Sequence, residues 1–89
     1  LFTVKGDSMI GASIEEGDKV IVDRALSPKH GDIVVAVVDG DYTLKRLYRH
    51  MGQVELHAEN PAYPPIRFSE GSELQVWGVV VASIKVHKT

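Results

Sequence analysis

Ser8 is the first residue whose surroundings could support chemistry. It lies between Asp7 and Met9 in a small, polar stretch that follows a predicted strand. A hydroxyl in such a turn can be exposed, and nearby backbone N–H groups can converge on an oxyanion, as a serine nucleophile requires. The same composition is typical of a serine that only hydrogen-bonds within its own turn, so the turn alone leaves both interpretations open.

Lys45 is the second candidate, because it lies in the middle of a predicted strand over residues 42–48. A lysine acts as a general base only as the neutral amine, and with an ordinary pKa of about 10.4 roughly one molecule in a thousand has that form near pH 7. Burial favours the neutral amine and can lower the pKa by about 3–5 units. Alternation along the strand places Thr43 and Leu47 on the face of Lys45 without showing which face is buried, so from the strand alone a solvated lysine is the favoured interpretation.

The histidines offer the rival chemistry of a Ser-His-Asp triad, but none lies in a telling context. His30 lies in a turn, His50 and His57 flank a predicted loop and strand, and His87 lies near the C-terminus. Ser8 also lacks the Gly-x-Ser-x-Gly sequence of a nucleophile elbow. The histidines lack metal-ligand spacing, and a chain without cysteine has no thiolate for zinc. We therefore expect four solvated histidines, no metal and no cofactor.

The basic segment at residues 45–50 contains an aromatic residue, Tyr48, and could contact a nucleic-acid backbone. Asp39 and Asp41 adjoin it, and the chain has 12 acidic against 10 basic residues, for a net charge of −2. Such a balance argues against a surface that mainly neutralises phosphates. A structural strand is the favoured interpretation, with no direct sequence-specific DNA binding by this domain.

The composition predicts one small globular domain. The chain has 89 residues, of which 44% are hydrophobic and 25% charged, close to the average for folded proteins. The longest apolar run, residues 76–84, is far shorter than the roughly 20 residues of a membrane-spanning helix, and no signal peptide is visible. The absence of cysteine suits a reducing compartment, so we expect a cytoplasmic protein. The chain opens on Leu1 rather than methionine, which indicates a fragment or a processed form.

The elements that must position these residues are short strands, because β-branched residues alternate with turn residues at intervals of about ten. We expect a mainly β, single compact domain of mostly antiparallel strands, with one turn or short helical piece at residues 6–13. The expected strands cover residues 1–5, 19–24, 33–38, 42–48, 53–57, 66–68 and 74–86.

Four turn and strand signals are specific enough to test. Asp39-Gly40, between two apolar segments, predicts a hairpin that pairs residues 33–38 with residues 42–48. The unbroken apolar run at residues 33–38 predicts a central strand that is buried on both faces. Gly78 inside the last strand predicts a bulge or a close backbone contact, and Gly71-Ser72 predicts a turn before that strand.

The ordered motifs of the chain resemble the C-terminal domain of the LexA/UmuD autopeptidases of S24 type. They are GDSM at 6–9, EGD at 16–18, VD at 22–23, HGDIV at 30–34, VDGDYTLKRL at 38–47, ENPAYPPI at 59–66 and VWGVV at 76–80. The similarity covers essentially the whole chain, so it implies one LexA/signal-peptidase-like peptidase domain over residues 1–89. The spacing of Ser8 and Lys45 is similar to that of the Ser–Lys dyad in this family.

The resemblance implies roles for three residues. Ser8 would be the nucleophile and Lys45 the neutral base that takes its proton, as in the bacterial signal peptidases of similar fold. The backbone N–H groups of Asp7 and Ser8 would be the oxyanion donors. In the family the attacked bond, Cys–Gly or Ala–Gly, lies in an arm upstream of the serine. This chain lacks that arm, so it resembles a cleavage product or a truncated catalytic core.

Within the family, residues 38–43 and 60–66 look closer to UmuD than to LexA. A UmuD-like protein would cleave itself when stimulated by a RecA filament on single-stranded DNA. Its shortened homodimer would then join a Y-family DNA polymerase for error-prone translesion synthesis in the SOS response. The alternative is a LexA-like or phage repressor with an upstream DNA-binding domain that cleavage would release from its operator. The apolar strand at residues 74–86 is a candidate dimer contact, although it could equally be wholly core.

Overall fold

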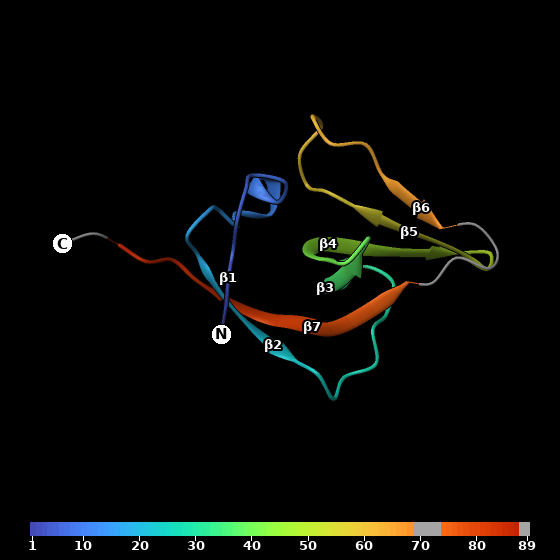
Figure 1. Cartoon of the computed structure of the whole chain (residues 1–89), viewed down its shortest axis with the longest axis horizontal. Coiled ribbons are helices and arrows are strands. Elements are labelled where there is room, and N and C mark those ends of the chain that lie inside the picture. The colour runs from blue at the N-terminus through green and yellow to red at the C-terminus, as the bar shows by residue number, and fades with distance from the viewer. Residues whose placement is uncertain (69–73, 88–89) are drawn as a thin grey trace.

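The computed structural model describes residues 1–68 and 74–87, which form seven strands and one short 3-10 helix (Figure 1). The elements are β1 (Phe2–Thr3), η1 (Ile10–Ala12), β2 (Lys19–Asp23), β3 (Ile33–Val38), β4 (Asp41–His50), β5 (Gln53–His57), β6 (Ile66–Phe68) and β7 (Gln75–Ile84). The predicted mainly β fold is confirmed. Within the described ranges, no helix is long and apolar enough to cross a membrane.

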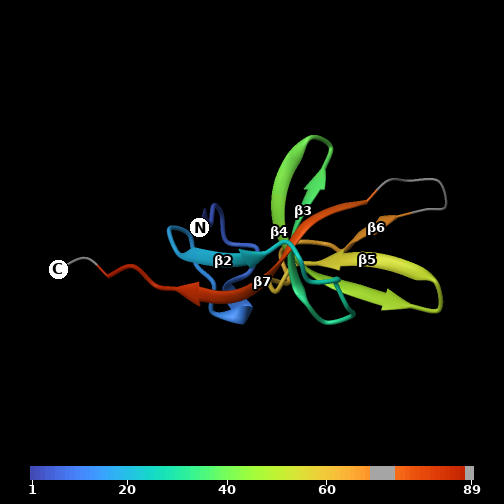
Figure 2. The same cartoon turned by 90° about the horizontal axis from the view of Figure 1, so that it is seen from below.

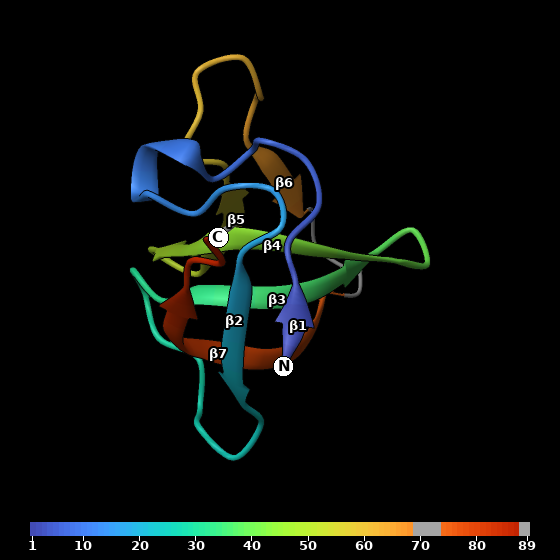
Figure 3. The ribbon, with the colours of Figure 1, turned by 90° about the vertical axis from the view of Figure 1, so that its left-hand side faces the viewer.

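All seven strands belong to one antiparallel sheet with the order β1-β2-β7-β3-β4-β5-β6. The predicted central strand, β3, is the middle strand of this order. β7 pairs with β3 through residues 75–79 and with β2 through residues 79–84, and its register shifts once against each partner. These irregularities bend β7, so that one long strand pairs with two strands that run in different directions. In Figure 3, β2 crosses β3, and the end of β7 turns to run beside β2.

Gly78 of β7 packs against the side chain of Val22 on β2. A Cβ atom on this residue would lie 2.4 Å from Cγ1 of Val22, so no larger side chain fits without movement. The register shift between β3 and β7 also falls next to Gly78, which is paired with Val35. The predicted bulge and close contact are therefore both present.

The predicted hairpin between β3 and β4 is confirmed, and it projects from the rest of the sheet in Figure 2. Asp39 and Gly40 have φ values of 50° and 83°, the left-handed values that a two-residue hairpin turn requires. β4 continues to His50, beyond the predicted end, because a second turn at Met51 and Gly52 joins it to β5. β4 therefore pairs with β3 through residues 41–46 and with β5 through residues 46–50.

Two hydrophobic clusters lie on opposite sides of β3. Adjacent residues Val34 and Val35 are both 0% exposed, which confirms that β3 is buried on both faces. The first cluster contains Val4, Met9, Ile14, Val20, Val35 and Leu44, and the second contains Val34, Ala36, Leu47, Leu56 and Val79. Met9, at 1% exposure, anchors the segment that follows β1.

The two terminal strands are shorter than predicted. β1 covers only Phe2–Thr3, although Val4 still exchanges backbone hydrogen bonds of 2.9 Å with Asp18 and Gly17. β7 ends at Ile84, and the next residue, Lys85, turns its side chain to the segment that precedes β2. The predicted turn at Gly71-Ser72 lies outside the described residues.

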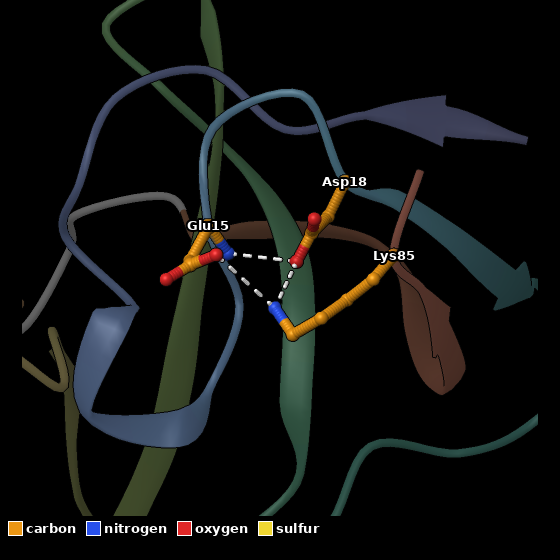
Figure 4. A network of polar contacts seen from close by, with 3 residues as sticks. All are labelled: Glu15, Asp18 and Lys85. Carbon is orange, nitrogen blue, oxygen red and sulfur yellow. Dashed lines mark hydrogen bonds and ion pairs between the residues drawn. The ribbon is translucent and has the colours of Figure 1, made fainter. Parts of the chain in front are cut away.

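An ionic network ties the segment after β7 to the segment before β2 (Figure 4). The carboxylate of Asp18, only 5% exposed as a residue, accepts hydrogen bonds of 2.9 Å from the Glu15 backbone N–H and from Lys85 Nζ. Lys85 also approaches the Glu15 carboxylate at 3.5 Å. Buried carboxylates are tolerated when they are paired in this way, so the network holds the two ends of the domain together.

Candidate active site

Ser8 lies in the segment between β1 and η1, where Gly6 adopts a φ of 78° that favours glycine. The next residue, Met9, is buried in the first hydrophobic cluster and fixes the segment to the core. Ser8 itself is half-buried. The hydroxyl is therefore carried by a short loop that is anchored on its C-terminal side and open to solvent on the other.

Lys45 contacts Ser8 directly. Its Nζ lies 3.0 Å from Ser8 Oγ, 2.8 Å from Thr43 Oγ1 and 3.2 Å from the Leu44 carbonyl oxygen. Lys45 is 8% exposed, so the sequence alternative of a solvated strand lysine is wrong. The structure therefore brings together the two side chains that the sequence analysis singled out.

Burial lowers the pKa of Lys45 below its ordinary value, because the surrounding protein disfavours the charged ammonium. A neutral amine has two N–H donors and one lone pair. The three neighbours match this inventory, since Thr43 Oγ1 and the Leu44 carbonyl can accept while the Ser8 hydroxyl can donate. The geometry thus suits an amine that takes a proton from Ser8.

A cavity of about 630 Å³ surrounds the pair. It is lined by residues 2–8, residues 41–45 and Tyr63. In the described part of the chain, β1 pairs only with β2, and β5 pairs with β4 only from Arg46 onward. The cavity therefore runs between one edge of β1 and the unpaired edge of the first half of β4, where an extended peptide could form main-chain hydrogen bonds.

Asp7, the residue before the serine, is held by a distant loop. Asn60 Nδ2 donates to the Asp7 carbonyl oxygen at 2.9 Å, and the Tyr63 hydroxyl donates to Asp7 Oδ1 at 2.5 Å. Among the described residues, neither the Asp7 nor the Ser8 backbone N–H donates a hydrogen bond. Both predicted oxyanion donors are therefore available to a ligand, and the resemblance had assigned no role to Asn60 or Tyr63.

Thr43 is a further contact of Lys45 that the sequence analysis did not single out. Its place two residues before Lys45 on the same strand puts both side chains on one face, which is the only signal that could have indicated the contact. The hydroxyl gives the amine a fixed partner besides Ser8. Thr43 thus belongs to the environment that sets the position of the Lys45 amine.

The histidines do not contribute to this cavity, because none of its lining residues is a histidine. His30, His50 and His87 are exposed as predicted. The prediction is wrong for His57, which is half-buried because it stacks on the Tyr48 ring and pairs with Glu55 at 2.7 Å. Within residues 1–68 and 74–87, no group of three or more metal-ligand side chains lies close enough together to hold a metal ion.

Arg46, next to Lys45, is committed to internal contacts. Its Nε lies 2.5 Å from Glu59 Oε1, and its Nη1 donates to the Gly31 carbonyl oxygen at 2.6 Å. Together with the burial of Lys45, these contacts turn two of the basic side chains of residues 45–50 inward. They support the structural interpretation of the segment over a nucleic-acid surface.

Comparisons with known proteins show the family of the chain. Residues 1–81 match the protein family described as Peptidase S24-like. The chain is 48% identical over 79 residues to a LexA repressor of Magnetococcus marinus, an alignment that covers 89% of the chain and 34% of the relative. It is 41% identical over 86 residues to a LexA repressor of Syntrophotalea carbinolica, with 97% and 43% covered. It is 40% identical over 87 residues to a LexA repressor of Bordetella avium, with 98% and 41% covered.

The chain thus spans well under half of the length of each of these relatives. The matched region contains Ser8 and Lys45, and it ends within β7. The similarity therefore covers the cavity and the buried lysine described above.

Proposed function

The chain belongs to the Peptidase S24-like family of serine peptidases, and we propose that residues 1–89 are the self-cleaving, dimer-forming C-terminal domain of a LexA-like repressor. The relatives named above are all LexA repressors, which favours this function over the UmuD-like one that the sequence motifs suggested. None of these relatives supports a Y-family polymerase partner. The contact of 3.0 Å between a buried lysine amine and a serine hydroxyl carries the proposal.

In the proposed reaction, Lys45 Nζ takes the hydroxyl proton while Ser8 Oγ attacks the carbonyl carbon of the scissile peptide. The resulting oxyanion faces the backbone N–H groups of Asp7 and Ser8, which donate no other hydrogen bond among the described residues. The C–N bond then breaks, and the Lys45 ammonium returns the proton to the leaving amine. A water molecule, deprotonated by the same amine, hydrolyses the ester on Ser8.

The substrate class follows from the shape of the cavity. Its walls include residues 2–8 on one side and residues 41–45 on the other, and both contain strand edges that no other described strand pairs with on the cavity side. Such edges bind extended polypeptide through main-chain hydrogen bonds. We propose that the occupant is an upstream arm of the same protein, which is delivered at high local concentration because it is covalently attached.

The proposed partners are a second copy of the chain and a RecA filament on single-stranded DNA, within a cytoplasmic SOS response. The second half of β7 supports the dimer, because it pairs with β2 but extends beyond its pairing with β3. Val81 and Ile84 in this half are 51% and 45% exposed. Exposed apolar residues on an unpaired strand edge favour association with another copy.

Self-cleavage of the full-length parent protein tests the proposal. Ser8→Ala and Lys45→Ala should each slow cleavage at alkaline pH by about a thousandfold or more, because each removes a group that no neighbour replaces. Ser27→Ala and Lys29→Ala, at exposed positions outside the cavity, are the matched controls and should cleave like the parent. Parent-like cleavage by Ser8→Ala or Lys45→Ala would overturn the proposed function.

A further inference from the structure

We propose that Asn60 and Tyr63 are positioning residues that orient the Asp7–Ser8 peptide, so that the Ser8 N–H points into the cavity as an oxyanion donor. The inference rests on the proposed function and extends it to a loop that lies more than fifty residues further along the chain. The two side chains hold different parts of Asp7. Asn60 binds its main-chain carbonyl, and Tyr63 binds its side-chain carboxylate.

Because the peptide bond is planar, the contact of Asn60 with the Asp7 carbonyl also restricts the direction of the Ser8 N–H. The described backbone contains no cis peptide, so the Asp7 carbonyl and the Ser8 N–H point in opposite directions from one planar unit. Asn60 fixes the carbonyl at 2.9 Å from a side that does not line the cavity. The Ser8 N–H then points away from Asn60, and we place it toward the cavity because Asp7 and Ser8 both line it.

The second contact prevents Asp7 from rotating. The Tyr63 hydroxyl donates to Asp7 Oδ1, and this hydrogen bond raises the pKa of Tyr63 above its ordinary value. The hydrogen bond therefore favours the protonated tyrosine, which is the form that donates to Asp7. Main chain and side chain of Asp7 are thus both held.

The loop that carries these two side chains is itself well fixed. Asn60 accepts the Ala62 N–H through Oδ1 at 3.0 Å, and its carbonyl accepts the Tyr63 N–H at 3.0 Å. Pro61 limits the backbone further. Because this loop is already ordered, it can hold Asp7 in one orientation with little further loss of conformational entropy during the reaction.

Glu59 connects the same loop to the rest of the site. Its carboxylate pairs with Arg46, the neighbour of Lys45 on β4, and its carbonyl accepts the Gly11 N–H at 2.7 Å. A Cβ on Gly11 would lie only 2.5 Å from that carbonyl oxygen, so the loop and the segment after Ser8 are in close contact. The loop thus joins the strand that carries the base to the segment that carries the nucleophile.

Self-cleavage rates of the full-length parent protein across alkaline pH test this role. Tyr63→Phe removes one hydroxyl and Asn60→Ala removes the carbonyl contact. Each should lower the plateau rate about tenfold or more, since outright loss of an oxyanion donor costs about 10²–10³. The midpoint of the pH profile should stay unchanged, because the hydrogen-bond partners of Lys45 in the described structure are Ser8, Thr43 and the Leu44 carbonyl. Asp7→Asn, which keeps an acceptor for Tyr63, should retain more activity than Asp7→Ala.

Tyr48→Phe, a change of the same chemistry outside the cavity, is the matched control and should cleave like the parent. Thermal unfolding of each variant shows that it is folded at the assay temperature, and Tyr63→Phe keeps the test informative if Asn60→Ala does not fold. If Tyr63→Phe and folded Asn60→Ala cleave at the parent plateau rate while Ser8→Ala and Lys45→Ala are inactive, only the positioning role is overturned. A shifted midpoint with an unchanged plateau would also overturn it. Cleavage by Ser8→Ala or Lys45→Ala would instead overturn the proposed function.

Discussion

The amine of Lys45 lies 3.0 Å from the hydroxyl oxygen of Ser8, although 37 residues separate the two along the chain. The contact depends on two independent features. The hairpin between β3 and β4 places Lys45 opposite Val34, and the burial of Met9 draws the Ser8 segment onto the sheet. Neither feature alone would bring an amine with a lowered pKa against a hydroxyl.

The rate of self-cleavage should rise with pH and then reach a plateau. The proposed base is the neutral amine of Lys45, whose pKa burial lowers below the ordinary value of 10.5. The active fraction therefore grows as pH approaches this lowered pKa and is complete above it. The intact fraction of the parent protein, followed on gels over time at a series of pH values, gives the profile. A rate that is independent of pH, or that falls as pH rises, would contradict a lysine base.

Lys45→Met should change how stability depends on pH. The folded pKa of Lys45 lies below 10.5, so the unfolded chain holds this proton more tightly than the folded one. Stability of the parent should therefore rise with pH between the lowered pKa and 10.5, whereas the methionine variant lacks this contribution. Urea unfolding of both proteins across that window measures the difference. Parallel curves of stability against pH for parent and variant would show that folding does not change the pKa of Lys45.

Thr43→Val should slow cleavage. The Thr43 hydroxyl accepts a hydrogen bond of 2.8 Å from Lys45 Nζ, which orients the amine. A single hydrogen bond is worth about 0.5–1.5 kcal/mol, so the plateau rate should fall by up to about tenfold. Thr43→Ser keeps the hydroxyl and should behave like the parent. A valine variant with the parent profile would assign Thr43 no part in positioning the amine.

Asp18→Asn should destabilise the domain at neutral pH but not in acid. The backbone N–H of Glu15, and then Lys85, lower the pKa of the Asp18 carboxyl below 3.8 (Figure 4). The stabilisation is therefore fully present above 3.8 and is lost as pH falls through the lowered folded pKa. Thermal unfolding of parent and variant should show a gap near neutral pH that closes in strong acid. Asp39→Asn, in an exposed turn, is the control and should show no such gap.

The fold was predictable wherever a local signal determines it. Asp39-Gly40 specifies a hairpin by its own backbone preferences, and the apolar run of β3 specifies burial on two faces. The burial of Lys45 was not predictable from alternation, because the curved sheet buries Leu44 and Lys45 on opposite faces of the same strand. Only the family resemblance, which implied a neutral Lys45 base, indicated that Lys45 is covered.

The contacts between loops could not be predicted from the sequence, for a different reason. Asn60 and Tyr63 reach Asp7 across more than fifty residues, and neither loop has a periodicity that would reveal the pairing. The partial burial of His57 could not be predicted for a similar reason. It depends on the ring of Tyr48 on β4 and on Glu55, two residues earlier on β5. Such contacts follow from strand register, which a sequence pattern specifies only indirectly.

The two-residue length of the turn between β3 and β4 also sets the parity of every side chain on β4. Lys45 is opposite Val34 and Leu44 is opposite Val35, so each shares a face with a different hydrophobic cluster. One inserted residue that slipped the pairing by a single position would exchange these faces along the whole strand. It would move Lys45 to the face of the first cluster and leave Ser8 facing a leucine in place of the amine. Mispacking and inactivation would therefore be one event rather than two.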